Sequence, residues 1–295
     1  MKSLSEKQSL WTVKDVLEWT ADYFRTKGIR TARLDAEVLL AHSLRVDRLH
    51  LYLNLDRPLE PSERARYREL IQRRARREPV ARIVGTKEFW SIPFRIVPGV
   101  LIPRPDTETL VEVVLREVEG RSELRLLEIG TGTGAVPIAV LKENPGVRML
   151  ATDVNMRALH ITRLNARDAG VLQSLDVAAM DLFEGLRPGT EFDLICSNPP
   201  YIPTGDIQGL DPEVRDFEPL NALDGGPDGL DLIRRLVVGS KDHLAKGGSL
   251  ILEIGATQGD AVRGILRRMG GMTNVETFHD LSGRTRVIKG SRLDP

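Results

Sequence analysis

Beyond residue 125 the sequence alternates short apolar runs with segments of helical periodicity. The predicted strands are residues 126–129, 148–152, 176–179, 193–196 and 249–254. Such an alternation is typical of a parallel sheet covered by helices on both faces. The pattern changes near the C-terminus, where residues 275–279 and 285–289 flank the turn-forming Ser282-Gly283 with no helix between them. We therefore expect an α/β domain that ends in an antiparallel hairpin.

The part of the chain before residue 78 has a different pattern. Apolar residues recur there at spacings of three and four, which predicts a helix behind Thr12 as N-cap, a second helix from Thr31, a short third helix, and a fourth that runs from Pro61 to about Arg77. A length of 295 residues leaves room for such a satellite domain beside one large core. The fourth helix is rich in arginine, which indicates either a solvated face or a contact surface for an acidic or RNA-bearing partner.

A connecting segment follows. Residues 82–84 and 89–97 are predicted as two strands of a hairpin, with Gly85 near the turn. Asp106 or Thr107 then caps the next helix. The predicted organisation is a helical domain at 1–78, a β-hairpin linker at 79–105, and the α/β domain at 106–295.

Charge and composition limit the kind of protein. Lys plus Arg and Asp plus Glu both number 42, so the basic excess expected of a duplex-DNA binder is missing. Cys196 is the single cysteine and lies in an apolar run, as an inert thiol in a reducing compartment would. No stretch reaches the roughly 18 apolar residues of a membrane span, and residues 1–8 are polar. We expect a soluble, cytoplasmic protein.

A glycine-rich loop follows the first strand of the α/β domain: Gly130, Thr131, Gly132, Thr133 and Gly134. Glycines there let a ligand approach the backbone at the carboxyl edge of the sheet. Asp153 ends the second strand, where its carboxylate can accept hydrogen bonds from two ribose hydroxyls. The pattern predicts an adenosine-bearing cofactor, but these residues alone fit nicotinamide cofactors and S-adenosylmethionine equally well. Glu128 would either contact the cofactor or cap the loop.

The fourth strand delivers Asn198, Pro199, Pro200 and Tyr201 to the same edge. Two prolines hold the backbone extended and remove two N–H donors, so that hydrogen-bond acceptors dominate. The side-chain oxygen of Asn198 and the carbonyl of Pro199 can each accept one N–H of a planar NH2 group, while the Tyr201 ring packs against its flat face. Such a clamp raises electron density on a weakly nucleophilic amide nitrogen during methyl transfer. We expect Asn198, Pro199 and Tyr201 to be catalytic.

Other kinds of active site lack a signal. The five histidines, His42, His50, His160, His243 and His279, are scattered, with no cysteine or carboxylate at ligand spacing. We expect no metal and no serine or cysteine nucleophile.

Several blocks together resemble the release-factor glutamine methyltransferases, the PrmC/HemK-type family. They are Glu78-Pro79 with Gly85 and Glu88-Phe89, Leu101-Ile102-Pro103-Arg104-Pro105-Asp106-Thr107-Glu108, the glycine loop, Asn198-Pro199-Pro200-Tyr201-Ile202, Glu218-Pro219, Ala222-Leu223-Asp224-Gly225-Gly226 and Asp228-Gly229-Leu230. The glycine loop and the Asn-Pro-Pro-Tyr block also occur in other amino-methyltransferases, and the remaining blocks are more specific.

The resemblance implies a class I, Rossmann-like methyltransferase domain and an N-terminal helical domain that helps to hold a protein substrate. It implies S-adenosyl-L-methionine as cofactor, S-adenosyl-L-homocysteine as product, and the glutamine of the Gly-Gly-Gln motif of bacterial peptide-chain release factors as substrate. Gly130 to Gly134, Asp153 and Asn198 would bind the cofactor, and Asn198 to Tyr201 would hold the glutamine. Some members carry tryptophan where this chain has Leu182; Asp181 before it would hydrogen-bond the adenine amino group or cap a loop.

Three other functions stay open at this point. An adenine-N6 methyltransferase acting on DNA or RNA would face the same two N–H donors, although the neutral charge disfavours a direct nucleic-acid substrate. A glutamine methyltransferase of a ribosomal protein would share fold and clamp. A catalytically silent cofactor-binding module would leave the intact clamp unexplained.

Overall fold

The computed structural model describes residues 11–292, so the polar segment 1–8 lies outside the described residues. The chain forms two compact units that divide after Gly85. The first contains helices only. The second contains a small hairpin and the large sheet. Within residues 11–292 no helix combines the length and apolar character needed to cross a membrane.

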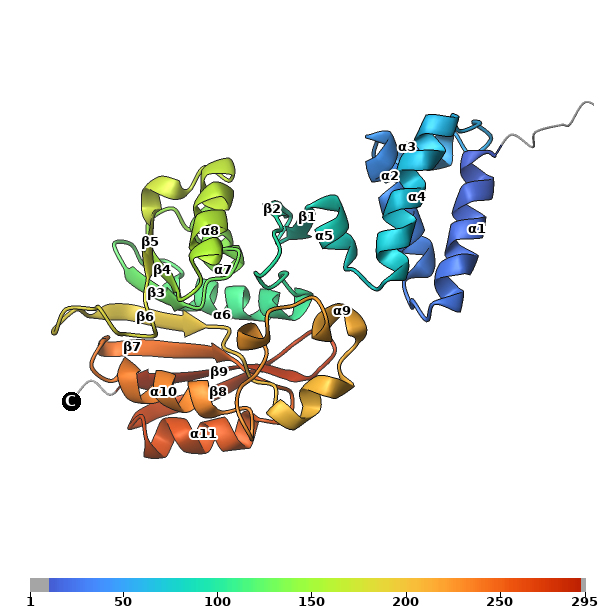
Figure 1. Cartoon of the computed structure of the whole chain (residues 1–295). Helices are drawn as coiled ribbons and strands as arrows, with labels where there is room; N and C mark the ends of the chain where they lie inside the picture. The colour runs from blue at the N-terminus through green and yellow to red at the C-terminus, as the bar shows by residue number, and fades with distance from the viewer. Residues whose placement is uncertain (1–10, 293–295) are drawn as a thin grey trace, which may run out of the picture. The chain divides into compact units, whose positions relative to one another are not determined.

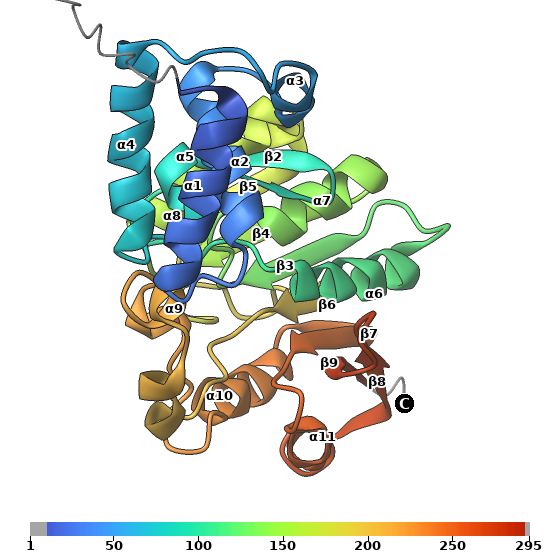
Figure 2. The ribbon, with the colours of Figure 1, turned by 90° about the vertical axis from the view of Figure 1, so that its right-hand side faces the viewer.

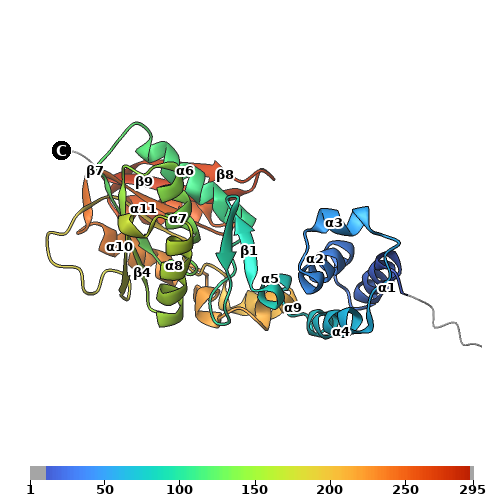
Figure 3. The ribbon, with the colours of Figure 1, turned by 90° about the horizontal axis from the view of Figure 1, so that it is seen from above.

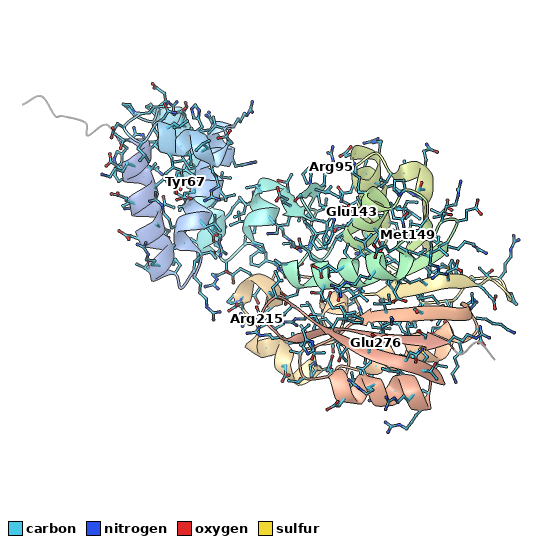
Figure 4. All side chains as sticks on the ribbon, turned by 180° about the vertical axis from the view of Figure 1, so that it is seen from behind. Tyr67, Arg95, Glu143, Met149, Arg215 and Glu276 are labelled. Atoms are coloured by element: carbon cyan, nitrogen blue, oxygen red, sulfur yellow. The ribbon has the colours of Figure 1, made fainter. Side chains whose placement is uncertain are left out.

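The first unit confirms the four predicted helices and adds a fifth. They are α1 (Val13–Thr26), α2 (Ala32–Leu44), α3 (Arg48–Leu53), α4 (Pro61–Ala75) and α5 (Val80–Val84). Thr12 caps α1 as predicted, in a reciprocal capping box with Asp15. The helices enclose a core in which Phe24 and Leu39 are fully buried, and Figure 4 shows Tyr67 inside this unit. The Tyr67 hydroxyl donates to the carbonyl of Ala36 at 2.9 Å, which satisfies its buried polar group.

The arginines of α4, and Arg77 just after it, have several different environments. Arg74 is buried and Arg73 pairs with Glu78, while Arg77 donates to the carbonyls of Lys27 and Gly28. Arg66 and Arg68 are exposed. Part of the arginine content therefore stabilises the helical unit itself.

The predicted strand at residues 82–84 is wrong, because this segment belongs to α5. Pro79 is the N-cap of this helix, Gly85 is its C-cap with a positive φ of 77°, and Ile83 is buried in the helical core. The hairpin is displaced as a result. It consists of β1 (Thr86–Phe89) and β2 (Ile92–Arg95), joined at Trp90 and Ser91. These two residues have φ of 53° and 56°, the tight turn that suits the twist of a two-residue hairpin.

The large sheet has seven strands in the order β5-β4-β3-β6-β7-β9-β8. They are β3 (Arg125–Ile129), β4 (Arg148–Asp153), β5 (Leu175–Ala179), β6 (Phe192–Ser197), β7 (Leu244–Glu253), β8 (Met272–His279) and β9 (Thr285–Arg292). Strands β3 to β7 pair in parallel, and β9 runs antiparallel to both β7 and β8. The predicted parallel strands and terminal antiparallel hairpin are confirmed. Because β3 lies between β4 and β6, the strand order reverses there, and a ligand site is expected at this point of the sheet.

Helices cover both faces of this sheet. The helices are α6 (Glu108–Val118), α7 (Ala135–Glu143), α8 (Met156–Asp168), α10 (Asp231–Ser240) and α11 (Gly259–Arg268). Figures 1 and 2 show α6, α7 and α8 on one side and α10 and α11 on the other. The view from above places the β1–β2 hairpin beside α8 (Figure 3), where Arg95 donates to the side chains of Asn165 and Asp168.

Short helical turns occupy the connections. They are η1 (Pro105–Thr107) before α6, η2 (Leu172–Ser174) before β5, and η3 (Thr204–Gly209), α9 (Pro212–Arg215) and η4 (Leu220–Ala222) between β6 and α10. The last three belong to the long segment that leaves the carboxyl end of β6, so this segment lies at the same edge as the glycine loop.

Candidate active site

The carboxyl ends of four parallel strands border one cavity of about 920 Å³. The residues after β3, at the end of β4, after β5 and after β6 all line it, together with residues 99–107 before α6 and residues 219–235 after η3. Of the predicted site residues, those that line it are Gly130, Thr131, Gly132, Thr133, Asp153, Asp181, Leu182, Asn198 and Pro200. Gly134, Pro199 and Tyr201 are outside the lining. The structure thus brings most of the predicted residues to one site.

The glycine loop turns sharply between β3 and α7. Gly130, Gly132 and Gly134 have φ of 78°, 58° and 81°, the left-handed region in which a side chain is strained. The N–H groups of Gly130 and Thr131 both donate to the carbonyl of Thr152 on β4. The backbone of the loop is therefore hydrogen-bonded to the neighbouring strand.

Asp153 is bonded to this loop. Its Oδ2 accepts the N–H of Gly132 at 2.9 Å and its Oδ1 accepts the N–H of Asn155 at 2.8 Å. Burial raises the pKa of Asp153, and these backbone donors oppose the shift. Each carboxylate oxygen has a second lone pair, so the group keeps acceptor capacity toward the cavity.

Glu128 lies beneath the loop and is 2% exposed. Burial is the largest influence on the pKa of Glu128 and raises it to about 8. The Thr131 hydroxyl lowers this pKa, whereas the charge of Asp153 raises it further. The hydroxyl is near enough to affect the pKa, yet Oε2 of Glu128 has no partner of full hydrogen-bond geometry within the described residues. A cationic group in the cavity would satisfy this buried carboxyl.

Asn198 projects from the end of β6 and its amide nitrogen donates to Oγ1 of Thr107 at 3.1 Å. The amide oxygen accepts no hydrogen bond from the residues that the structure describes. Pro199 is buried behind it. Tyr201 is half-buried against the core of the sheet, and its hydroxyl donates to Glu253 at 3.3 Å.

Asp181 and Leu182 lie on the opposite side of the glycine loop from β6, after β5. Both oxygens of Asp181 pair with Arg235 at 3.2 Å, on a part of the cavity wall that is about half exposed to solvent. Leu182 is buried at 8% exposure and has a positive φ of 54°. Leu182 therefore contributes an apolar part of the cavity wall.

Two buried polar residues at the site were missed by sequence reasoning. The sequence pattern indicates Thr107 only as a candidate helix cap and gives Glu253 no role. Glu253 ends the apolar run of β7. A carboxylate at the end of a buried parallel strand is the same pattern that indicates Asp153, so this pattern could have identified Glu253 as well. Within residues 11–292 no group of three or more His, Cys, Asp or Glu side chains is arranged to hold a metal ion.

The sheet order, in which β9 lies antiparallel between β7 and β8, together with the glycine loop after β3, defines the fold of the class I S-adenosylmethionine-dependent methyltransferases. A crystal structure of a methyltransferase from Pyrococcus furiosus has a similar fold, with a TM-score of 0.51 and 18% identity over 76% of this chain and 99% of that one.

Sequence comparison gives the family. Residues 15–85 match the family described as the PrmC N-terminal domain, and residues 105–209 match the methyltransferase small domain. The release factor glutamine methyltransferase of Geobacter sulfurreducens is 42% identical over 97% of this chain and 99% of its own length. That of Rhodopirellula baltica is 40% identical over 94% and 95%. The chain belongs to the release factor glutamine methyltransferase family.

Proposed function

We propose that this protein transfers a methyl group from S-adenosylmethionine to the side-chain nitrogen, N5, of the glutamine in the Gly-Gly-Gln motif of bacterial peptide-chain release factors. The observation that carries the proposal is the position of Asn198, whose amide oxygen is available at the edge of the cavity that the glycine loop borders. The near-full-length similarity to relatives of that name supports the choice of substrate.

The cavity fits the cofactor by its chemistry. Asp153 offers two carboxylate oxygens for the ribose hydroxyls, and the loop from Gly130 to Gly134 lets the ligand approach the backbone. The buried Glu128 matches the ammonium group of the methionine part. Leu182 supplies an apolar wall and Asp181 an acceptor for the adenine amino group. When bound, the cofactor supplies an electrophilic methyl group on a sulfonium.

The residues Asn198 to Tyr201 orient the attacking nitrogen. Oδ1 of Asn198 and the carbonyl of Pro199 accept the two N–H groups of the substrate amide. Both oxygens are available for this, since neither accepts a hydrogen bond from the described residues of the protein. Both acceptors bind more strongly as positive charge develops on the nitrogen, so they stabilise the transition state more than the ground state. The Tyr201 ring limits the nitrogen to one plane, and alignment for in-line attack accounts for much of the remaining rate enhancement.

We assign the parts of the chain accordingly. Residues 106–295 carry most of the cofactor site and residues 1–78 bind part of the protein substrate. Residues 79–105 link the two, with α5 packed in the helical unit and residues 99–104 contributing to the cavity wall. Large apolar side chains exposed on the helical unit support the assignment of residues 1–78, since a protein partner would cover them. They are Trp19, Leu34, Leu49, Tyr52 and Leu53.

The test incubates the protein with labelled S-adenosylmethionine and a purified release factor, and locates the label by peptide mass spectrometry. We expect one methyl group on the Gly-Gly-Gln glutamine. The Asn198→Ala variant should reduce kcat by about 10²–10³-fold, the cost of losing one preorganised group at the reacting centre.

The matched control is Asn274→Gly, on the exposed surface of β8 outside the cavity, where a φ of 47° suits glycine. It should keep wild-type activity. In parallel incubations with ribosomal proteins or with DNA or RNA, label on one of these and none on the release factor would replace the release factor as substrate.

A further inference from the structure

A buried polar network lies behind the proposed clamp. Its members are Thr107 of η1, Glu253 at the end of β7 and the hydroxyl of Tyr201. Leu252 pairs with Ser197 in the parallel register of β7 and β6, so Glu253 and Asn198 follow directly after paired positions on neighbouring strands. Thr107 is 4% exposed and Glu253 is 1% exposed. Burial of these two polar side chains needs an explanation, because each costs free energy unless it is hydrogen-bonded.

Two hydrogen bonds join these groups in pairs, and the paired strands bring the two pairs together. Asn198 donates to Oγ1 of Thr107 at 3.1 Å, and the Tyr201 hydroxyl donates to Oε1 of Glu253 at 3.3 Å. The Thr107 hydroxyl lies near enough to Glu253 to lower its pKa, although Oε2 of Glu253 has no partner at full hydrogen-bond geometry within residues 11–292. Above its pKa, Glu253 is therefore a carboxylate acceptor near the remaining hydroxyl proton of Thr107.

The chemistry of the groups gives this network a direction. A hydroxyl has one proton to donate, and an ionised carboxylate can only accept. When Thr107 donates toward Glu253, its lone pairs are left for the amide nitrogen of Asn198. The Asn198 oxygen must then point away from Thr107.

We propose that Thr107 and Glu253 are positioning residues that hold the Asn198 amide with its oxygen directed toward the substrate nitrogen. The inference rests on the proposed function, since an acceptor is needed only if the substrate presents N–H donors. The opposite orientation of the amide would place an NH2 against the NH2 of the substrate, and the two donors would repel each other.

The ionisation of Glu253 makes the arrangement sensitive to pH. Burial raises the pKa of Glu253 to about 7, while Thr107, Tyr201 and Arg286 lower it and Asp106 raises it. Arg286 from β9 pairs in turn with Asp106 and Asp280. Once protonated, Glu253 can itself donate to Thr107, whose proton is then free to bond the Asn198 oxygen and stabilise the wrong orientation. Activity should therefore fall as the pH drops below about 7.

The experiment compares the full-length wild type with three variants, using a purified release factor and labelled S-adenosylmethionine from about pH 6 to about pH 9. Thr107→Val removes the hydroxyl at nearly constant volume, and Thr107→Ser restores it. Glu253→Gln is isosteric but cannot ionise. Cofactor affinity, measured by calorimetry, reports whether the site is intact.

We expect Thr107→Val to lower kcat by about 10- to 100-fold, the factor that one mismatched buried hydrogen-bonding group produces, with cofactor affinity unchanged. Thr107→Ser should remain within about threefold of the wild type. Glu253→Gln should lower kcat similarly and also abolish the acid limb of its pH profile, which a merely structural role would not do.

The inference is overturned if Thr107→Val keeps wild-type kcat, or if Glu253→Gln retains the acid limb. If Glu253→Gln does not fold, the two Thr107 variants test the inference on their own. A loss of kcat in Thr107→Val that Thr107→Ser does not restore would also contradict the inference. Failure of the wild type to methylate the Gly-Gly-Gln glutamine would instead refute the proposed function, so the two failures are distinguishable.

Discussion

Gly134 and Thr162 approach each other so closely that a Cβ on Gly134 would lie 2.9 Å from Cγ2 of Thr162 and 3.0 Å from Cδ1 of Ile138. Thr162 is fully buried on α8 and its hydroxyl donates to the carbonyl of Gly132. The third glycine of the loop is therefore required for helix packing, which explains why it does not line the cavity.

Gly134→Ala should lower the free energy of unfolding by about 2–4 kcal/mol, from left-handed strain plus the clash with buried side chains. Urea denaturation measures the loss. Gly170→Ala is the matched control, because Gly170 has a φ of 77° but no atom within 4 Å of the added Cβ. It should cost only about 1 kcal/mol. Equal losses in the two variants would show that the contact with Thr162 is unimportant.

Local sequence patterns predicted the sheet well, because most of the parallel strands are apolar runs that end at a polar or glycine residue. The same patterns failed at residues 82–84, where Ile83 and Val84 favour a strand by β-branching. Packing of Ile83 into the helical core decided otherwise. A five-residue segment has too little periodicity to reveal which of the two competing effects dominates.

The candidate site shows the corresponding limit. Asp153 and Asn198 were predictable because each follows a strand at the switch point of the sheet. The partners of Asn198 were not, since Thr107 is 91 positions earlier in the chain and no local pattern reports such a contact. Glu253 carried the right signal, but the register that places it beside Asn198 is set by long-range pairing of β6 and β7.

Glu128→Gln should stabilise the protein at high pH. With a native pKa of about 8 against an unfolded value near 4.5, the native state binds more protons than the unfolded chain between these pH values. The free energy of unfolding therefore falls as the pH rises from about 4.5 to about 8. Glutamine has no proton to lose, so the variant should gain roughly 1–3 kcal/mol relative to the wild type between about pH 5 and about pH 8.

Urea denaturation of the wild type and the Glu128→Gln variant at about pH 5 and about pH 8, without cofactor, measures this difference in the free energy of unfolding. Glu253 titrates in both proteins, so its contribution to the pH dependence cancels in the comparison. A difference that shrinks toward high pH would contradict the assigned shift.

Asp153→Asn should weaken cofactor binding. The change removes a charged acceptor that we assign to the ribose hydroxyls and that also holds the N–H groups of Gly132 and Asn155. Loss of one charge-assisted hydrogen bond costs about 1.5–3 kcal/mol, so the Kd for S-adenosylmethionine should rise at least roughly tenfold by calorimetry. Asp176→Asn, exposed on the neighbouring strand β5 and outside the cavity, is the control. An unchanged Kd in the Asp153 variant would remove this residue from the cofactor site.

Arg74→Met should destabilise the helical unit, because it leaves Asp35 buried without its cation. Nε of Arg74 donates to Oδ2 of Asp35 at 2.7 Å, and the two side chains are 5% and 8% exposed. Removing one partner of a buried pair costs about 3–5 kcal/mol, whereas replacing both by apolar residues of similar size is often nearly neutral. The double variant Asp35→Leu/Arg74→Met should therefore be more stable than the single variant. Urea denaturation followed by circular dichroism measures both, and a double variant less stable than the single one would mean that the ion pair itself, rather than the penalty of an unpaired charge, stabilises this unit.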